Sequence, residues 1–302
     1  MIIDTHCHYN CEPLSLEAEF HWKNALKQNV IGGICVGTNL SNSVLALQLA
    51  EKFSTLYAAI GIHPEEYTHK IKSLLNADIY SQAEIDTVIQ QDITAFTNLL
   101  ETTLKQKNTK LLAIGEIGLD YYSLKTKGIK RTIVENMQKA VFSAQLELAF
   151  QHSLPVILHV RDQIERTQTN AYYDTFNILN QLVSQYKNEN KKIPHFILHC
   201  ASGPIDYIEN CINLGGYIGF AGNVTYTNAP ELREIFKITP SNRVLLETDA
   251  PYLAPNEKKG QICEPQFITE TADFLQHTYE IDLDIILKNT LAVFPEFQKV
   301  VQ

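Results

Sequence analysis

The chain opens with Met1-Ile2-Ile3-Asp4-Thr5-His6-Cys7-His8, a short apolar run that ends in two histidines. This combination decides the fold, because it recurs. Seven further runs rich in Ile, Val and Leu follow along the chain, and each is followed by a helical pattern. They span residues 31–37, 56–62, 111–116, 155–160, 195–200, 216–220 and 244–249. Near-continuous apolar strands are typical of a parallel sheet that is buried on both faces.

Amphipathic segments separate these runs. The clearest covers residues 85–104, where apolar side chains recur with i, i+3, i+4 spacing. Further helices are expected over residues 137–150 and 173–186, and two short ones with Pro204 and Pro230 at the first helical position. Eight strand–helix units in 302 residues match an α/β fold, the (β/α)8 TIM barrel. A doubly wound open sheet is the alternative, because periodicity does not distinguish a closed ring from an open sheet.

Composition narrows the class of protein. Of the 302 residues 45% are hydrophobic, which excludes a disordered chain. With 34 acidic and 25 basic residues the net charge is −9, so a cationic surface that wraps duplex nucleic acid is not expected. An enzyme acting on nucleic acid is still compatible with this charge, because bound divalent cations supply positive charge locally. We find no linker-like segment and no internal repeat, and therefore expect residues 1–302 to form a single domain.

The sequence also indicates a compartment. The first residues have neither the basic region nor the apolar core of a secretory signal. No run approaches the roughly 18 apolar residues of a membrane span. The six cysteines lie at irregular spacings, as expected of reduced thiols. We therefore expect a cytoplasmic protein with no membrane partner, and no obligate protein partner is evident.

Residues able to bind metals fall at or just past the carboxyl ends of the expected strands. In a barrel these ends meet at one face, where active sites lie. A lone histidine at a strand end is more often structural than functional, but two such histidines at equivalent places weaken that interpretation. The candidate metal ligands are four histidines and two carboxylates: His6, His8, Glu116, His159, His199 and Asp249.

Nitrogen and oxygen donors together suit Zn²⁺, Mn²⁺ or Fe, and less obviously Mg²⁺. Six donors are too many for one tetrahedral site. They suit two cations bridged by Glu116, an arrangement that activates water and clamps a phosphoryl or carbonyl group. Glu247 shares a strand face with Asp249 one layer deeper, so we expect it to orient a histidine.

Six motifs follow one another along the chain: DTHCH (4–8), GIHP (61–64), GEIGLDYY (115–122), PVILHVRD (155–162), HCASG (199–203) and ETDAPYL (247–253). Taken together and in this order, they resemble those of the TatD family of metal-dependent hydrolases. The resemblance implies an amidohydrolase-type barrel and a metal-dependent deoxyribonuclease or phosphodiesterase. It carries the same six residues onto the family's metal ligands, and it implies that His63 and Arg161 face the substrate. Residues 64–110 are longer than the family pattern leads us to expect.

We therefore expect a divalent-metal-dependent hydrolase of phosphodiester bonds, a deoxyribonuclease acting on DNA ends or single strands with two ions of Mg²⁺, Mn²⁺ or Zn²⁺. Glu116 and Asp249 are the expected catalytic residues, Asp249 accepting a proton from the attacking water. Tyr121 and Tyr122 are candidates to stack a base, although packing under a loop is expected of at least one of them. An amide, lactone or ester hydrolase using the same site is the alternative. A non-catalytic metal-binding protein is the third hypothesis.

Overall fold

The computed structural model describes residues 1–76, 81–124, 129–162 and 170–301. Strands within these ranges form one parallel sheet whose spatial order is the chain order. They are β1 (Ile2–Cys7), β2 (Val30–Val36), β3 (Leu56–Ile60), β4 (Leu111–Asp120), β5 (Val156–Arg161), β6 (Phe196–Leu198), β7 (Tyr217–Phe220) and β8 (Val244–Leu246). Eight parallel strands in this order form a nearly closed barrel, so the prediction of a TIM barrel is confirmed and the doubly wound alternative is wrong.

Hydrogen bonds between β1 and the segment around β8 bring the two ends of the sheet together. The hydroxyl of Thr5 donates to the carbonyl oxygen of Leu246 at 2.9 Å. Beyond the end of β8, the backbone N–H of Asp249 donates to the carbonyl oxygen of His6, also at 2.9 Å. These contacts hold the first strand beside the last and set their register at the carboxyl end of the barrel.

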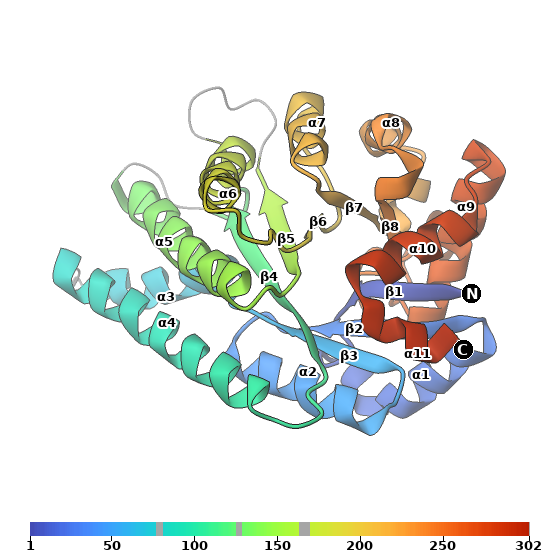
Figure 1. The fold of residues 1–302 in the computed structure, drawn as a ribbon, viewed down its shortest axis with the longest axis horizontal. Coiled ribbons are helices and arrows are strands. Elements are labelled where there is room, and N and C mark those ends of the chain that lie inside the picture. The colour runs from blue at the N-terminus through green and yellow to red at the C-terminus, as the bar shows by residue number, and fades with distance from the viewer. Residues whose placement is uncertain (77–80, 125–128, 163–169, 302) are drawn as a thin grey trace.

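Helices cover the outside of the barrel between the strands (Figure 1). They are α1 (Ala18–Lys27), α2 (Leu40–Lys52), α3 (Glu65–Asn76), α4 (Gln82–Leu104), α5 (Ile129–Gln151), α6 (Ala171–Asn188), α7 (Ile205–Asn213), α8 (Pro230–Ile238), α9 (Ile268–Tyr279), α10 (Leu283–Val293) and α11 (Gln298–Val301). The three long helices predicted from periodicity are confirmed as α4, α5 and α6. Among the described helices, none is long and apolar enough to cross a bilayer.

The two prolines expected to open helices behave differently. Pro230 is the first residue of α8, as predicted. Pro204 precedes α7 with ψ of 143°, an extended value that no helical residue has, so it is the N-cap instead. The prediction for Pro204 is therefore wrong by one position.

Alternating strand residues divide the core into two layers. Ile34 and Val36 point into the barrel, whereas Cys35 between them packs against the surrounding helices. At the amino ends of the strands, Phe297 joins the inner layer and lies against Gly32. The carboxyl-terminal segment therefore closes one end of the barrel and leaves the opposite end for a functional site.

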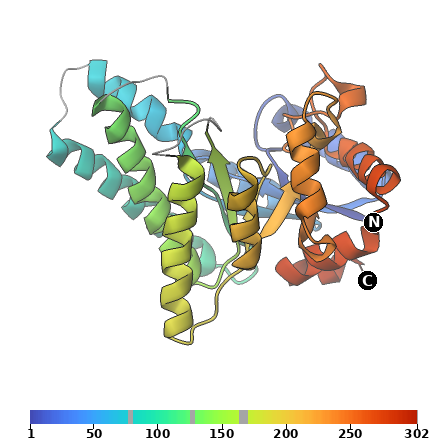
Figure 2. The ribbon, with the colours of Figure 1, turned by 90° about the horizontal axis from the view of Figure 1, so that it is seen from above.

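The long segment between β3 and β4 adds two helices to the outer layer. α3 and α4 (cyan) lie beside α5 (green) on one flank of the barrel (Figure 2). Ser81 caps α4 through a reciprocal pair of hydrogen bonds with Glu84, which satisfies backbone groups that a helix start leaves open. Phe96 and Leu100 of α4 are completely buried. We propose that this segment folds together with the barrel as one unit.

Replacing Phe96 with Ala tests that proposal. Removal of a buried phenyl ring should lower the free energy of unfolding by about 3–5 kcal/mol and leave a single transition in a denaturant titration. Gln91→Ala on the exposed face of the same helix is the control and should change stability by less than about 0.5 kcal/mol. A separate early transition in Phe96→Ala, with the main transition unmoved, would show that α4 folds independently of the barrel.

Candidate metal centre

The strands deliver the candidate residues to the open end of the barrel. His6 lies in β1 and His159 in β5, while His199 directly follows β6. Glu116 was expected to end its strand, but β4 continues to Asp120, so that prediction is wrong. Glu116 thus lies inside the strand, where the pairing of β4 with β5 shifts register between Ile114 and Ile117.

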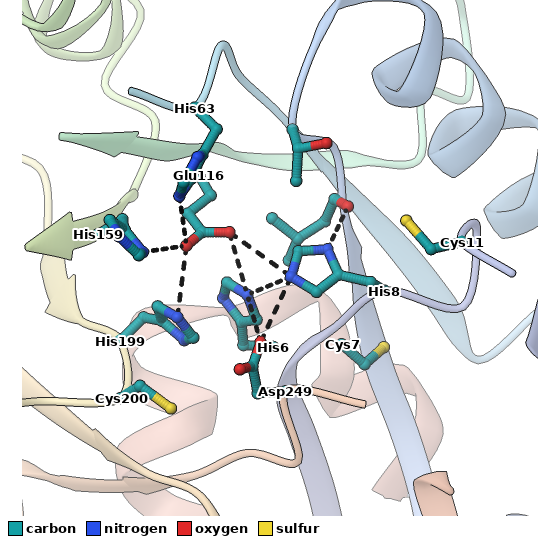
Figure 3. A network of polar contacts seen from close by, with 12 residues as sticks. His6, Cys7, His8, Cys11, His63, Glu116, His159, His199, Cys200 and Asp249 are labelled. Carbon is teal, nitrogen blue, oxygen red and sulfur yellow. Dashed lines mark hydrogen bonds and ion pairs between the residues drawn. The ribbon is translucent and has the colours of Figure 1, made fainter. Parts of the chain in front are cut away.

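One group of donor atoms surrounds Oε2 of Glu116 (Figure 3). The Nε2 atoms of His6 and His8 each lie 3.5 Å from this oxygen and 3.1 Å from each other. Oδ1 of Asp249 lies 3.6 Å from His6 Nε2 and 3.4 Å from His8 Nε2. The ligand atoms of a tetrahedral ion with bonds of about 2.1 Å are about 3.4 Å apart. These four side chains therefore have the spacing of donors to one small cation.

A second group surrounds the other oxygen of the same carboxylate. Glu116 Oε1 lies 2.6 Å from His159 Nδ1, 3.4 Å from His199 Nε2 and 3.5 Å from His63 Nε2. The rings of His63 and His159 pack edge to face at 4.2 Å. Glu116 thus faces one donor group with each oxygen, and the structure brings all six predicted metal ligands together.

His8 and His199 each have an oxygen atom next to the ring nitrogen that points away from Glu116. His8 Nδ1 lies 3.1 Å from the carbonyl oxygen of Val36. His199 Nδ1 lies 3.2 Å from Oε1 of Glu247, so the predicted contact between Glu247 and a histidine is confirmed. The carbonyl oxygen behind the His8 ring fixes which nitrogen carries the proton and leaves the other free for a cation. Glu247 contacts His199 as an ion pair, and within the described residues neither Nδ1 of His199 nor Nδ1 of His6 has a hydrogen-bond partner.

Asp120 is a site residue that the sequence reasoning missed. Its Oδ2 lies 3.3 Å from His159 Nε2, on the side of the ring away from Glu116. Ser123 donates its N–H to Oδ1 and its O–H to Oδ2 of Asp120. The signal was available, because Glu116, Gly118 and Asp120 alternate along one strand face. Gly118 has φ of +146° and lies against the carbonyl of His159, where a Cβ would collide.

The buried carboxylates of the cluster favour positive charge beside them. Burial opposes ionisation of Glu116, but the imidazoles around it outweigh burial and hold its pKa well below the usual range. Burial also opposes protonation of His159 and His199. The carboxylates near these two rings outweigh burial and raise the pKa of His159 to about 9 and that of His199 to about 10. Divalent cations supply such charge, and the mixed nitrogen and oxygen donors suit them. The residues present therefore fit a metal centre.

Asp4 lies in β1 with His6 but does not join the donor groups. Its carboxylate accepts hydrogen bonds from the hydroxyl and the N–H of Thr248 at 2.7 and 2.9 Å. The hydroxyl of Tyr9 donates to it as well. Burial outweighs these hydrogen bonds and raises the pKa of Asp4 to about 7. Asp4 therefore ties β1 to the turn that carries Asp249, one layer beneath the donors.

Arg161 ends β5 at the rim of the site. Its side chain is exposed, and its guanidinium carbon lies 4.2 Å from the ring centroid of Tyr122. Tyr122 is also exposed, whereas Tyr121 is buried and donates a 2.8 Å hydrogen bond to Asp174. Tyr121 is therefore a packing residue and is not available to stack a base.

Comparison with known proteins places this site in a family. The sequence matches the family described as TatD related DNase over residues 3–297. It is 29% identical over 298 residues to the uncharacterized metal-dependent hydrolase YabD of Bacillus subtilis (strain 168), with 97% of this chain and 99% of the relative covered. It is 31% identical over 231 residues to the 3'-5' ssDNA/RNA exonuclease TatD of Klebsiella pneumoniae (strain 342), covering 76% and 70%.

A solved structure of a related protein has the same fold. The crystal structure of YjjV, a TatD homologue from Escherichia coli K12, superposes with a TM-score of 0.68 at 28% identity and covers 97% of this chain and 98% of that one. The match extends over the strands that carry both donor groups. On its barrel, its donor set and its sequence, this chain belongs to the TatD related DNase family of metal-dependent hydrolases.

Proposed function

We propose that this protein is a divalent-metal-dependent nuclease that hydrolyses phosphodiester bonds in single-stranded DNA or at DNA ends. The observation that carries the proposal is the carboxylate of Glu116, whose two oxygens face two adjoining donor groups. Paired cation sites that share a ligand suit displacement at phosphorus, because they stabilise both the attacking and the leaving oxygen. The name of the Klebsiella relative, 3'-5' ssDNA/RNA exonuclease, supports this substrate class.

Two ions of Mg²⁺, Mn²⁺ or Zn²⁺ are the proposed cofactors. His6, His8 and Asp249 would hold one of them together with Glu116, and His159 and His199 would hold the other on the opposite oxygen of Glu116. When bound, such ions neutralise charge on phosphoryl oxygens and lower the pKa of a water molecule towards ~7.

His63 has a different proposed role. Its Nδ1 accepts a 3.1 Å hydrogen bond from the backbone N–H of Glu65, so the neutral ring carries its proton on Nε2. A protonated Nε2 donates a hydrogen bond and does not bind a cation. Its side chain is 13% exposed, against 4% for Glu116. His63 is therefore suited to contact a phosphoryl oxygen of the substrate.

Asp249 is the proposed proton acceptor. Its side chain is 14% exposed, more than that of Glu116, so water and substrate can reach it. Burial opposes its ionisation, but the hydrogen bond with His8 and the nearby imidazoles lower its pKa, so the carboxylate is charged and able to accept a proton. The backbone of Asp249 has φ of +56°, and its N–H donates a hydrogen bond to the carbonyl oxygen of His6. These two features fix the position of Asp249 at the start of the turn. The same group can return the proton to the departing alkoxide.

Metal-stripped protein, given Mg²⁺, Mn²⁺ or Zn²⁺ separately, should shorten end-labelled single-stranded DNA with at least one of these ions. Asp249→Asn keeps the shape of the side chain but removes its charge and basicity, so cleavage should fall by at least about 100-fold. Gel electrophoresis of the labelled products measures both effects, and Asp249→Asn purified in the same way controls for contaminating nuclease. Cleavage of carbonyl esters but not of DNA, by protein that holds two ions, would favour the amide, lactone or ester hydrolase instead.

Glu116→Gln tests the shared carboxylate. An amide offers one acceptor oxygen where the carboxylate offers two, so bound metal should fall from two ions per chain to one or fewer, and activity by at least about 100-fold. Elemental analysis after dialysis measures occupancy. Glu135→Gln, which alters a buried carboxylate paired with Arg131 on α5, is the matched control. Two ions per chain in Glu116→Gln would rule out a shared ligand.

Arg161→Ala should raise KM for single-stranded DNA by about tenfold with kcat little changed, because a charge-assisted hydrogen bond to phosphate contributes about 1.5–3 kcal/mol. Steady-state kinetics separate the two parameters. Lys105→Ala removes an exposed positive charge at the end of α4 and serves as the control. An unchanged KM in Arg161→Ala would show that Arg161 only covers Tyr122.

A further inference from the structure

An exposed aromatic ring borders the first donor group. Tyr252 is 57% exposed, and its ring centroid lies 6.1 Å from that of His8, with the two planes inclined at 70°. His8, like His6, faces both Glu116 and Asp249 with its Nε2. The Tyr252 ring is therefore next to the metal centre and open to solvent.

The backbone holds this ring in a fixed place relative to Asp249. The N–H of Tyr252 donates a 2.8 Å hydrogen bond to the carbonyl oxygen of Asp249, and the N–H of Cys263 donates at 3.0 Å to the carbonyl oxygen of Pro251. A tyrosine on a held turn has only two side-chain torsions to restrict on binding, so it offers contact area at low entropic cost. The turn thus carries a catalytic carboxylate and an open aromatic face together.

Other exposed aromatic rings have contacts that Tyr252 does not share. The Tyr122 ring is covered by the Arg161 guanidinium. The Tyr173 hydroxyl donates to both carboxylate oxygens of Asp206, at 3.1 and 3.0 Å. Tyr252 instead contacts an imidazole of the metal centre edge to face.

The charge of the protein limits how it can hold a nucleic acid. With a net charge of −9, the chain as a whole repels a polyanion, so its overall charge adds no affinity for a strand of phosphates. Stacking of a base on an aromatic ring does not depend on net charge and tolerates every base, because each has a π face. An aromatic ring beside the cation sites therefore adds affinity for a nucleic acid strand that the net charge of the protein does not provide.

We propose that the ring of Tyr252 is the stacking platform for the nucleobase adjacent to the phosphodiester bond that is cleaved. This inference rests on the proposed function and narrows it. The substrate is a nucleic acid strand whose base at the cleavage point is unpaired and turned out, since a base inside a duplex has both faces covered. A strand that lacks this base loses the contact.

Equilibrium binding tests the platform separately from catalysis. The probes are a fluorescein-labelled, hydrolysis-resistant phosphorothioate hexathymidylate and a matched strand of abasic units, titrated with Mn²⁺-loaded protein and followed by anisotropy. The wild type should bind the thymidylate about tenfold more tightly than the abasic strand. Tyr252→Ala should lose this preference, whereas Tyr252→Phe, which keeps the ring, should retain it. Leu45→Ala removes an exposed apolar side chain on α2 and should behave as the wild type.

Equal affinities of the wild type for the two strands, or an unchanged preference in Tyr252→Ala, would overturn the platform. Cleavage of the ordinary phosphodiester strand is measured in parallel on the wild type. A tenfold preference that depends on the Tyr252 ring, without cleavage by any of the three metals, would support base stacking on Tyr252 but contradict both the nuclease and the place of the platform beside a cleaved bond. Cleavage without that preference would support the nuclease and contradict the platform.

Discussion

A carboxylate buried at the centre of the barrel is the constraint on which the rest of the site depends. Glu116 is 4% exposed at its side chain, and an ionised carboxylate at such a depth is stable only beside positive charge or hydrogen-bond donors. The structure surrounds it with imidazoles from strands far apart in the sequence. The barrel makes this convergence possible, because the carboxyl ends of all its strands meet at one face.

A second layer of polar contacts keeps the donors in place. Glu247 and Asp120 lie behind His199 and His159, and Asp4 joins β1 to Thr248 beside Asp249. Such outer contacts fix the orientation and the spacing of the rings that would bind a cation. The apolar residues that close the opposite end of the barrel need no such polar contacts, because they only have to pack without voids.

The architecture and the donor set could be predicted because both follow from local pattern. Each apolar run indicates a strand, and the polar residue at its end indicates the mouth of the barrel, so His6, His199 and Asp249 were identified without coordinates. Details that depend on pairing between strands could not be predicted. β4 runs past Glu116 to Asp120, with a register shift in its pairing with β5, and Asp120 contacts His159.

Other features depend on which side chains a neighbouring element happens to cover. Tyr121 and Tyr122 are adjacent in sequence, yet one is buried against Asp174 and the other lies under Arg161 at the surface. The role proposed for His63 depends on a backbone N–H two residues away, which only the turn before α3 reveals. Periodicity likewise indicated α4 but not α3, so the second added helix was found only in the structure.

The central claim is that one carboxylate joins two cation sites. Electron paramagnetic resonance of the wild-type protein loaded with Mn²⁺ tests it most directly, because two Mn²⁺ ions that share a bridging ligand are magnetically coupled. We expect a coupled spectrum that reaches full intensity at two equivalents of Mn²⁺ per chain. A spectrum of isolated ions at two equivalents, or saturation at one equivalent, would contradict it.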